Sequence, residues 1–141
     1  MKNKKILTIL CSILFLSAIG CSEVIRVYYE SGELKEEANF KESKQEGLSK
    51  EYYRSGPLRW EVNYKEGKQE GLSKEYYRSG GLKSEINYMN DQREGLSKTY
   101  YVSGEMFCVD NYKDDQQIKR KIYNNKGKLK YEQDFQYMEV N

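Results

Sequence analysis

A run of residues that returns every 24 positions constrains this 141-residue chain more than any other feature. Tyr28-Tyr29-Glu30-Ser31-Gly32 recurs with small changes at Tyr52, Tyr76 and Tyr100, and a decayed copy begins at Tyr123, one residue early. Twelve positions after each leading tyrosine stands an aromatic residue: Phe40, Tyr64, Tyr88, Tyr112 and Phe135. Such self-similarity predicts an array in which each copy is one supersecondary unit.

Each copy has the pattern of a β-hairpin. After the turn glycine, apolar side chains occupy alternate positions, as at Leu58, Trp60, Val62 and Tyr64, with charged or amide residues between them. Alternation with a period of two predicts a strand with one buried face, and the preceding Ser-Gly supplies a turn. We therefore expect an all-β fold, an elongated array of about five hairpins over 24–40, 48–64, 72–88, 96–112 and 118–135.

Stacked hairpins would bury one another's apolar columns, so such an array needs only a thin core. This agrees with the composition after residue 20, where only 41 of 121 residues are apolar and 14 of those are tyrosines. Cys108 falls in the inward column of Trp60, which favours a buried small side chain over the alternative, a reactive thiol. Asp110 stands where Val62 and Ile86 stand in earlier copies, so we expect a local fault and a looser fourth hairpin.

The double tyrosines leave one ring of each pair on the face away from this column, because neighbours on a strand point to opposite faces. The second ring forms a row at repeat spacing: Tyr29, Tyr53, Tyr77 and Tyr101. Two interpretations stay open. The row is a binding ladder, since tyrosine offers a large apolar face with a polar tip, or the rings pack repeat on repeat and only hold the array together.

Residues 1–20 are typical of an export signal, expected to be helical. Lys2, Lys4 and Lys5 precede an apolar stretch over 6–19 that is short for a membrane span. The stretch ends in Leu16-Ser17-Ala18-Ile19-Gly20-Cys21, which resembles the lipobox of bacterial lipoproteins. The resemblance implies cleavage before Cys21 and acylation of this residue. The alternative is ordinary cleavage that leaves a soluble secreted protein.

This interpretation divides the chain into a signal peptide (1–20), a lipidated N-terminus and short linker (21–23), a repeat domain (24–135) and a C-terminal tail (136–141). Several acyl chains on Cys21 would hold the protein firmly at a membrane. By the same resemblance, Ser22 after the cysteine favours the outer membrane. Since only two residues separate Cys21 from Val24, about 10 Å of extended chain, we expect the first hairpin to lie close to the lipid headgroups.

Several classes of function are excluded or disfavoured. Without histidine, the chain has no Ser-His-Asp or Cys-His nucleophile system and no histidine metal site. Once the signal is removed, 21 Lys+Arg face 22 Asp+Glu, a net charge of −1 that gives no argument for nucleic acid. Cys108 is then the one cysteine in the sequence of the repeat domain, so no disulfide framework is expected. We expect no catalytic constellation, no cofactor and no metal.

The repeats resemble the MORN-repeat variant family, whose pattern is roughly Gly-x-x-x-x-Tyr-Tyr-x-x-Gly-x-Leu. The segments 47–58 and 71–82 match it closely, and 95–106 nearly so. The resemblance covers about 24–135 and departs in the last unit, where Lys119 and Arg120 replace the Gly-Leu pair, as in a terminal cap. It implies β-hairpin arrays that contact proteins or membranes, with no shared catalysis. Related bacterial proteins carry a YwqK-type antitoxin label, which sits badly with an exported lipoprotein.

Three functional hypotheses follow. The first is an envelope-anchored module whose repeat face binds a protein, or else a glycan. The second is an antitoxin- or immunity-like inhibitor with one dedicated toxin as its partner. The third, an enzyme, is disfavoured because no pair of carboxylates lies in a pattern that predicts a shaped cleft.

Overall fold

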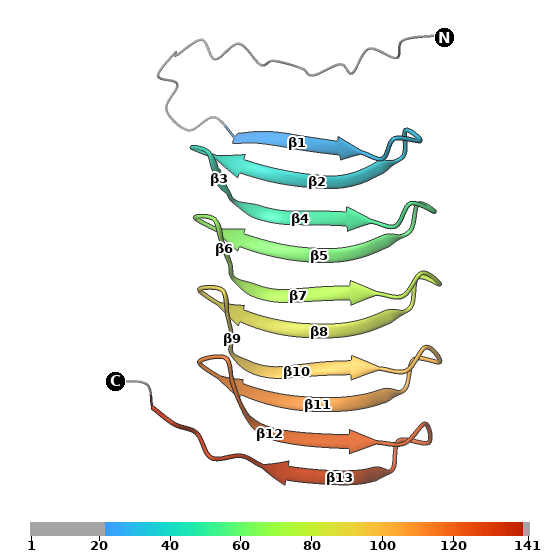
Figure 1. Cartoon of the computed structure of the whole chain (residues 1–141), viewed down its shortest axis with the longest axis vertical. Helices are drawn as coiled ribbons and strands as arrows, with labels where there is room; N and C mark the ends of the chain where they lie inside the picture. Colours follow the sequence, from blue (N-terminus) through green and yellow to red (C-terminus); the bar gives the residue numbers. More distant parts are fainter. Residues whose placement is uncertain (1–21, 140–141) are drawn as a thin grey trace.

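The computed structural model describes residues 22–139, which form one antiparallel β-sheet (Figure 1). Ten strands lie side by side in the order β1-β2-β4-β5-β7-β8-β10-β11-β12-β13, and the short strands β3, β6 and β9 pair with β2, β5 and β8. No helix occurs among these residues. The strands are β1 (Ser22–Tyr28), β2 (Leu34–Lys41), β3 (Lys44–Gln45), β4 (Gly47–Tyr52), β5 (Leu58–Lys65), β6 (Lys68–Gln69), β7 (Gly71–Tyr76), β8 (Leu82–Met89), β9 (Gln92–Arg93), β10 (Gly95–Tyr100), β11 (Met106–Lys113), β12 (Gln116–Tyr123) and β13 (Leu129–Asp134).

The predicted all-β array of five hairpins is confirmed. The hairpins are β1–β2, β4–β5, β7–β8, β10–β11 and β12–β13, and their bounds differ from the predicted ranges by one or two residues. The predicted signal peptide with its helix, and Cys21, lie outside the described residues. Because β1 already begins at Ser22, the sheet starts directly after the expected attachment residue.

The turns of the first four hairpins are closed by the repeated Tyr-x-x-Gly segment, and Asn124 takes the place of the tyrosine in the fifth. In the second hairpin the Tyr53 amide donates to the Pro57 carbonyl and the Gly56 amide donates to the Tyr53 carbonyl, both at 2.8 Å. Gly56 has a φ of 102°, which side chains rarely tolerate. A bulge between Glu51 and Tyr52 accompanies the turn. The turns of all five hairpins lie along one side of the sheet, opposite the return turns (Figure 1).

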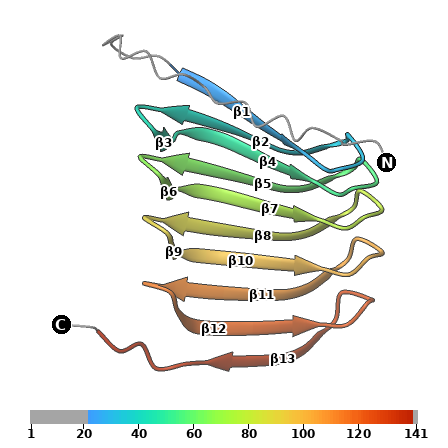
Figure 2. The same cartoon turned by 45° about the horizontal axis from the view of Figure 1, so that its top comes forward.

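The sheet is a single layer (Figure 2). Among the described residues, Ala38 and Cys108 are the buried hydrophobic side chains, and no side chain is completely buried. The prediction of a thin core between stacked hairpins is therefore wrong. The hairpins lie edge to edge rather than face to face, so the alternating apolar columns line one open face and pack only against cross-strand neighbours.

The opposite face carries a continuous row of charges across the sheet, which we call the charge row. From β1 to β13 its members are Arg26, Glu37, Lys50, Glu61, Lys74, Glu85, Lys98, Val109, Lys121 and Glu132, each directly opposite the next. The sign alternates except at Val109, which stands between two lysines. Ion pairs close both ends, at 2.6 Å between Arg26 and Glu37 and at 3.2 Å between Lys121 and Glu132.

The expected fault at Asp110 is not found. This carboxylate is 9% exposed. It accepts hydrogen bonds from Arg120 Nε at 2.8 Å, from Arg120 Nη2 at 2.9 Å and from Gln117 Nε2 at 2.7 Å. β10 and β11 pair over the same six residue pairs as β7 and β8. The fourth hairpin is therefore regular, because the last unit supplies a cation opposite the buried carboxylate.

Candidate binding face

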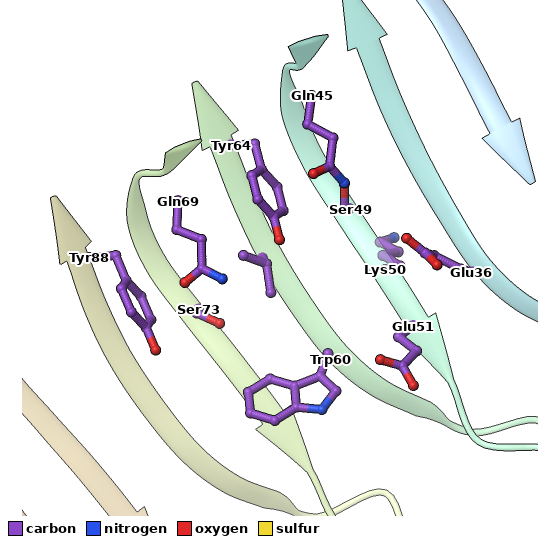
Figure 3. Close-up of a pocket in the computed structure, with 11 residues that line it drawn as sticks. Glu36, Gln45, Ser49, Lys50, Glu51, Trp60, Tyr64, Gln69, Ser73 and Tyr88 are labelled. Atoms are coloured by element: carbon purple, nitrogen blue, oxygen red, sulfur yellow. The ribbon is translucent and has the colours of Figure 1, made fainter. Parts of the chain in front are cut away.

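A pocket of about 290 Å³ lies on the face of the sheet that carries the alternating apolar columns, which we call the binding face. It crosses the joints between the first three hairpins (Figure 3). Its lining combines aromatic rings with amide, hydroxyl and carboxylate groups, from Glu36, Gln45, Ser49, Lys50, Glu51, Trp60, Val62, Tyr64, Gln69, Ser73 and Tyr88.

The rings of the pocket are placed by strand periodicity and by small neighbours. Trp60 and Tyr64 stand on one face of β5, and Tyr88 repeats the position of Tyr64 on β8 (Figure 3). Between them, Ser49 and Ser73 are only 7% and 3% exposed. Because serine is short, these two positions form the floor of the pocket and the rings form its walls.

Amide groups sit at the edge of the pocket where the return turns begin. Gln45 Nε2 lies 3.4 Å from Ser49 Oγ, and Gln69 occupies the same place one repeat later. In the next repeat this place belongs to Arg93, which donates to Asp115 at 2.6 Å and lies over the Tyr112 ring at 4.2 Å. The return-turn edge of the pocket thus carries neutral amides at Gln45 and Gln69, and a charged side chain takes this place one repeat further on.

The phenol group of Tyr88 stays protonated near neutral pH. Burial is the main cause that raises the pKa of Tyr88, and the nearby Arg93 opposes it without reversing it. The pocket therefore presents hydroxyl, indole and amide donors beside carboxylate acceptors and flat apolar surfaces. Such a mixture suits a ligand with apolar faces and polar edges.

The four predicted binding tyrosines all lie at the hairpin turns and contact the next repeat. Each hydroxyl donates to the backbone carbonyl of the first tyrosine one unit on. The distances are 2.7 Å for Tyr29, 2.8 Å for Tyr53, 2.7 Å for Tyr77 and 3.0 Å for Tyr101. These hydrogen bonds are the contacts between successive units that the packing interpretation requires. A binding role for this row stays a prediction.

The rings of this row also have neighbours on their faces. Arg59 and Arg78 place their guanidinium groups 5.7 and 5.4 Å from the centre of the Tyr53 ring, and Tyr101 meets Phe107 edge-on at 5.1 Å. Tyr101 additionally lines an open hollow near the last turn. The pocket on the binding face involves none of the four, so the structure separates the tyrosine row from the aromatic pocket.

Cys108 is buried, as the repeat predicts, with 6% exposure. Burial is the largest cause that raises the pKa of its thiol to about 11, and the neighbouring Asp110 adds to this effect. The thiol is therefore protonated at neutral pH, a state that is a poor nucleophile. Within residues 22–139 no three His, Cys, Asp or Glu side chains come together as a metal site, and no helix is long and apolar enough to cross a membrane.

Sequence reasoning missed the pocket because it assigned Trp60, Tyr64 and Tyr88 to a core. The signal that points to an open face is the absence of any second set of apolar residues to cover these columns. Gln45, Gln69, Ser49 and Ser73 recur in the repeat, but their chemistry gains meaning only once the strands are placed side by side.

Comparison with known proteins gives two findings and one negative result. No curated protein matches the chain. The crystal structure of TarM resembles 77% of this chain with 12% sequence identity and a TM-score of 0.43, and the chain spans only 19% of the length of TarM. The model of the MORN repeat variant family matches three consecutive stretches, 24–42, 45–66 and 69–90, which coincide with the first three hairpins.

Proposed function

We propose that this protein is an exported bacterial lipoprotein, anchored through acylated Cys21, whose binding face holds a protein partner. The observation that carries the proposal is the pocket over the first three hairpins, where flat rings and amide groups stand on an uncovered face of a single-layer sheet. Aromatic side chains dominate the energetics of protein interfaces, and a repeat sheet offers them on a rigid support. The proposal assigns no catalytic step to the chain.

The MORN repeats support a repeat-based binding module. The carboxylates beside Trp60 are paired, because Glu51 on one side of it pairs with Arg59 at 2.8 Å and Glu75 on the other side pairs with Lys83 at 2.8 Å. An interface core depleted of unpaired charge is typical of protein contacts. We therefore place the centre of the contact at Trp60, with polar groups around it.

A dedicated inhibitor of one toxin is the alternative function. The observation that favours it is that the pocket is not repeated along the sheet, since Trp60 is the only tryptophan of the chain and Arg93 replaces the pocket glutamines in the next unit. A single site suits one partner with a fixed stoichiometry. A general module would instead present the same surface several times.

Capture from envelope extracts tests the binding face. Wild-type protein should retain a partner that Trp60→Ala and the isosteric Gln69→Glu lose, because the first removes a ring and the second adds a charge at constant volume. Leu72→Ser is the matched control, since this side chain is 40% exposed on the opposite face of the same repeat. Capture of one toxic protein at fixed stoichiometry supports the inhibitor, and capture of several envelope proteins supports the module. Equal retention by all variants would refute the assignment of this face.

Metabolic labelling with a fatty-acid analogue tests the anchor. The full chain should incorporate the label and fractionate with membranes, whereas Cys21→Ser should do neither. A labelled Cys21→Ser variant, or unlabelled wild type, would show that anchoring does not depend on this residue.

A further inference from the structure

The sheet has two open edges, and the strands that form them differ in character. Within residues 22–139, β1 and β13 each pair with one neighbour only. Every residue of β1 is exposed, including Val24, Ile25, Val27 and Tyr28 at 46%, 40%, 41% and 56%. The strand contains no proline, and its bulge lies at the last residue pair. An exposed edge strand with several apolar side chains is a template for another strand.

The charge row continues to both edges and ends with opposite signs. Its member on β1 is Arg26 and its member on β13 is Glu132. At the internal joints between the first four hairpins, the row pairs an acidic residue with a lysine: Glu37 with Lys50, Glu61 with Lys74, and Glu85 with Lys98. Glu132 and Arg26 are therefore the two halves of one more joint.

On the binding face the same joint would bring together two exposed apolar side chains. Each joint between the first four hairpins contains two residue pairs. One is the pair of the charge row, and the other lies directly beside it, as Trp60 opposite Glu75 does. In the equivalent positions the outer strands carry Tyr131 and Val27, which are 43% and 41% exposed. An aromatic side chain opposite a β-branched one is a favourable cross-strand pair.

Strand direction permits the joint. Neighbouring strands are antiparallel along the whole ten-strand path, so β13 runs opposite to β1. A second copy displaced along the sheet would continue the alternation. The tail up to residue 139 turns towards β12 instead of covering β13. Met138 bonds to Gln116 at the start of β12, and Tyr137 bonds to Asp114 in the turn before it.

We propose that copies of this chain associate head to tail, with β13 of one copy pairing antiparallel to β1 of the next, Glu132 opposite Arg26 and Tyr131 opposite Val27. The contact is heterologous, so it extends into rows of copies with one continuous sheet. The joint lacks one hydrogen bond that the internal joints have. In each earlier unit the hydroxyl of the second tyrosine donates to a backbone carbonyl of the next unit, and Asn124 takes the place of this tyrosine in the last unit. It is therefore weaker than an internal joint, and confinement of the copies to one surface would promote it.

Disulfide trapping in the full chain tests the register. In a background with Cys11, Cys21 and Cys108 replaced by serine, where Ser84 already holds the column position of Cys108, Arg26→Cys with Glu132→Cys should give a ladder of dimers, trimers and longer species on oxidation. Ile25→Cys with Glu132→Cys is the matched control, since these side chains lie on opposite faces and should not form the ladder. Dimers from Arg26→Cys alone would indicate two-fold pairing of β1 strands and overturn the proposal, as would the absence of any cross-link.

Charge reversal gives a second test that does not depend on cysteine. Arg26→Glu and Glu132→Lys should each weaken self-association by about tenfold or more in sedimentation, because like charges then face each other. Mixing the two variants should restore association, since each then meets a partner of opposite sign. Circular dichroism would verify that both variants fold. Unchanged association of the single variants, or no recovery on mixing, would overturn the proposal.

Discussion

Replacing Arg120 by serine should destabilise the last hairpin, because the Asp110 carboxylate then stays buried without its cation. The arginine donates to both carboxylate oxygens, at 2.8 and 2.9 Å. Breaking a fully buried ion pair costs about 3–5 kcal/mol. Since the Arg120 side chain is 39% exposed and Gln117 still donates to Asp110, we expect a loss of about 2 kcal/mol.

A double variant separates the loss of the pair from the loss of the side chain. Asp110→Ile with Arg120→Ser removes both charges. It places an isoleucine opposite a serine, the same pair that Ile86 and Ser73 form in the third hairpin. Replacing both partners of a buried pair by well-packed residues is close to neutral. The double variant should therefore unfold near the wild-type urea concentration.

Urea unfolding, together with hydrogen exchange of the β12 and β13 amides, measures this effect. Exchange locates the loss, because repeat arrays unfold from their ends and the last hairpin should open first. If Arg120→Ser alone shifted stability by less than about 0.5 kcal/mol, the size usual for surface substitutions, the pair would not hold the hairpin. A double variant as unstable as the single one would refute the compensation.

The effect of Arg120→Ser should also depend on pH. Burial acts to raise the pKa of Asp110, but hydrogen bonds and charge from Arg120 outweigh it and hold this pKa below its usual value. A lowered pKa in the folded state adds stability above the unfolded pKa of about 3.9, and this stability is lost as pH falls through the folded pKa. The difference between wild type and variant should therefore be full at neutral pH and shrink on acidification below about 4.

Four further changes test other parts of the sheet. Val109→Glu completes the charge row and should stabilise the fold by about 0.2–1 kcal/mol, a gain that urea titrations should show disappearing near 1 M salt. Tyr53→Phe removes the 2.8 Å bond to the next repeat and should cost about 0.5–1.5 kcal/mol in the same assay. Because Cys108 is buried with a pKa of about 11, iodoacetamide should modify it in the native protein far more slowly than in urea. Ser43, with a φ of 64°, occupies the return-turn place of Gly67, so Ser43→Gly should raise the free energy of unfolding by about 0.5 kcal/mol and shift the urea midpoint upwards.

The hairpins were predictable because their signals are local. A turn closed by Tyr53 and Gly56, an apolar column with a period of two, and a fixed spacing to the next copy all act within one unit. What covers the column is not local. The alternating pattern predicts that Trp60 and Tyr64 share a face of the strand. It does not indicate whether another layer covers that face. For this reason, residues that were predicted to form a core line an open pocket instead.

Contacts between units were harder to predict because they depend on the register of one hairpin against the next. The bond from Tyr77 to the carbonyl of Tyr100 spans 23 residues and has no signature within either unit. Asp110 looked like a fault because its partner lies in the following strand. A comparison of equivalent positions in neighbouring units would have found this partner. Ser97 on β10 and Arg120 on β12 are both directly opposite Asp110 on β11, so the two residues that depart from the repeat, Asp110 and Arg120, lie side by side.

The repeat and its departures therefore have different roles in this molecule. The shared residues build the sheet: tyrosines join the units, glycines close the turns, and the charge row aligns the strands on the opposite face. A perfectly regular array would present the same groove at every joint and could not favour one place for a partner. The pocket is confined to the first three hairpins because Trp60 occurs once and because Arg93 replaces the glutamines beyond it. Specificity on such a sheet thus comes from the positions where the repeat is broken.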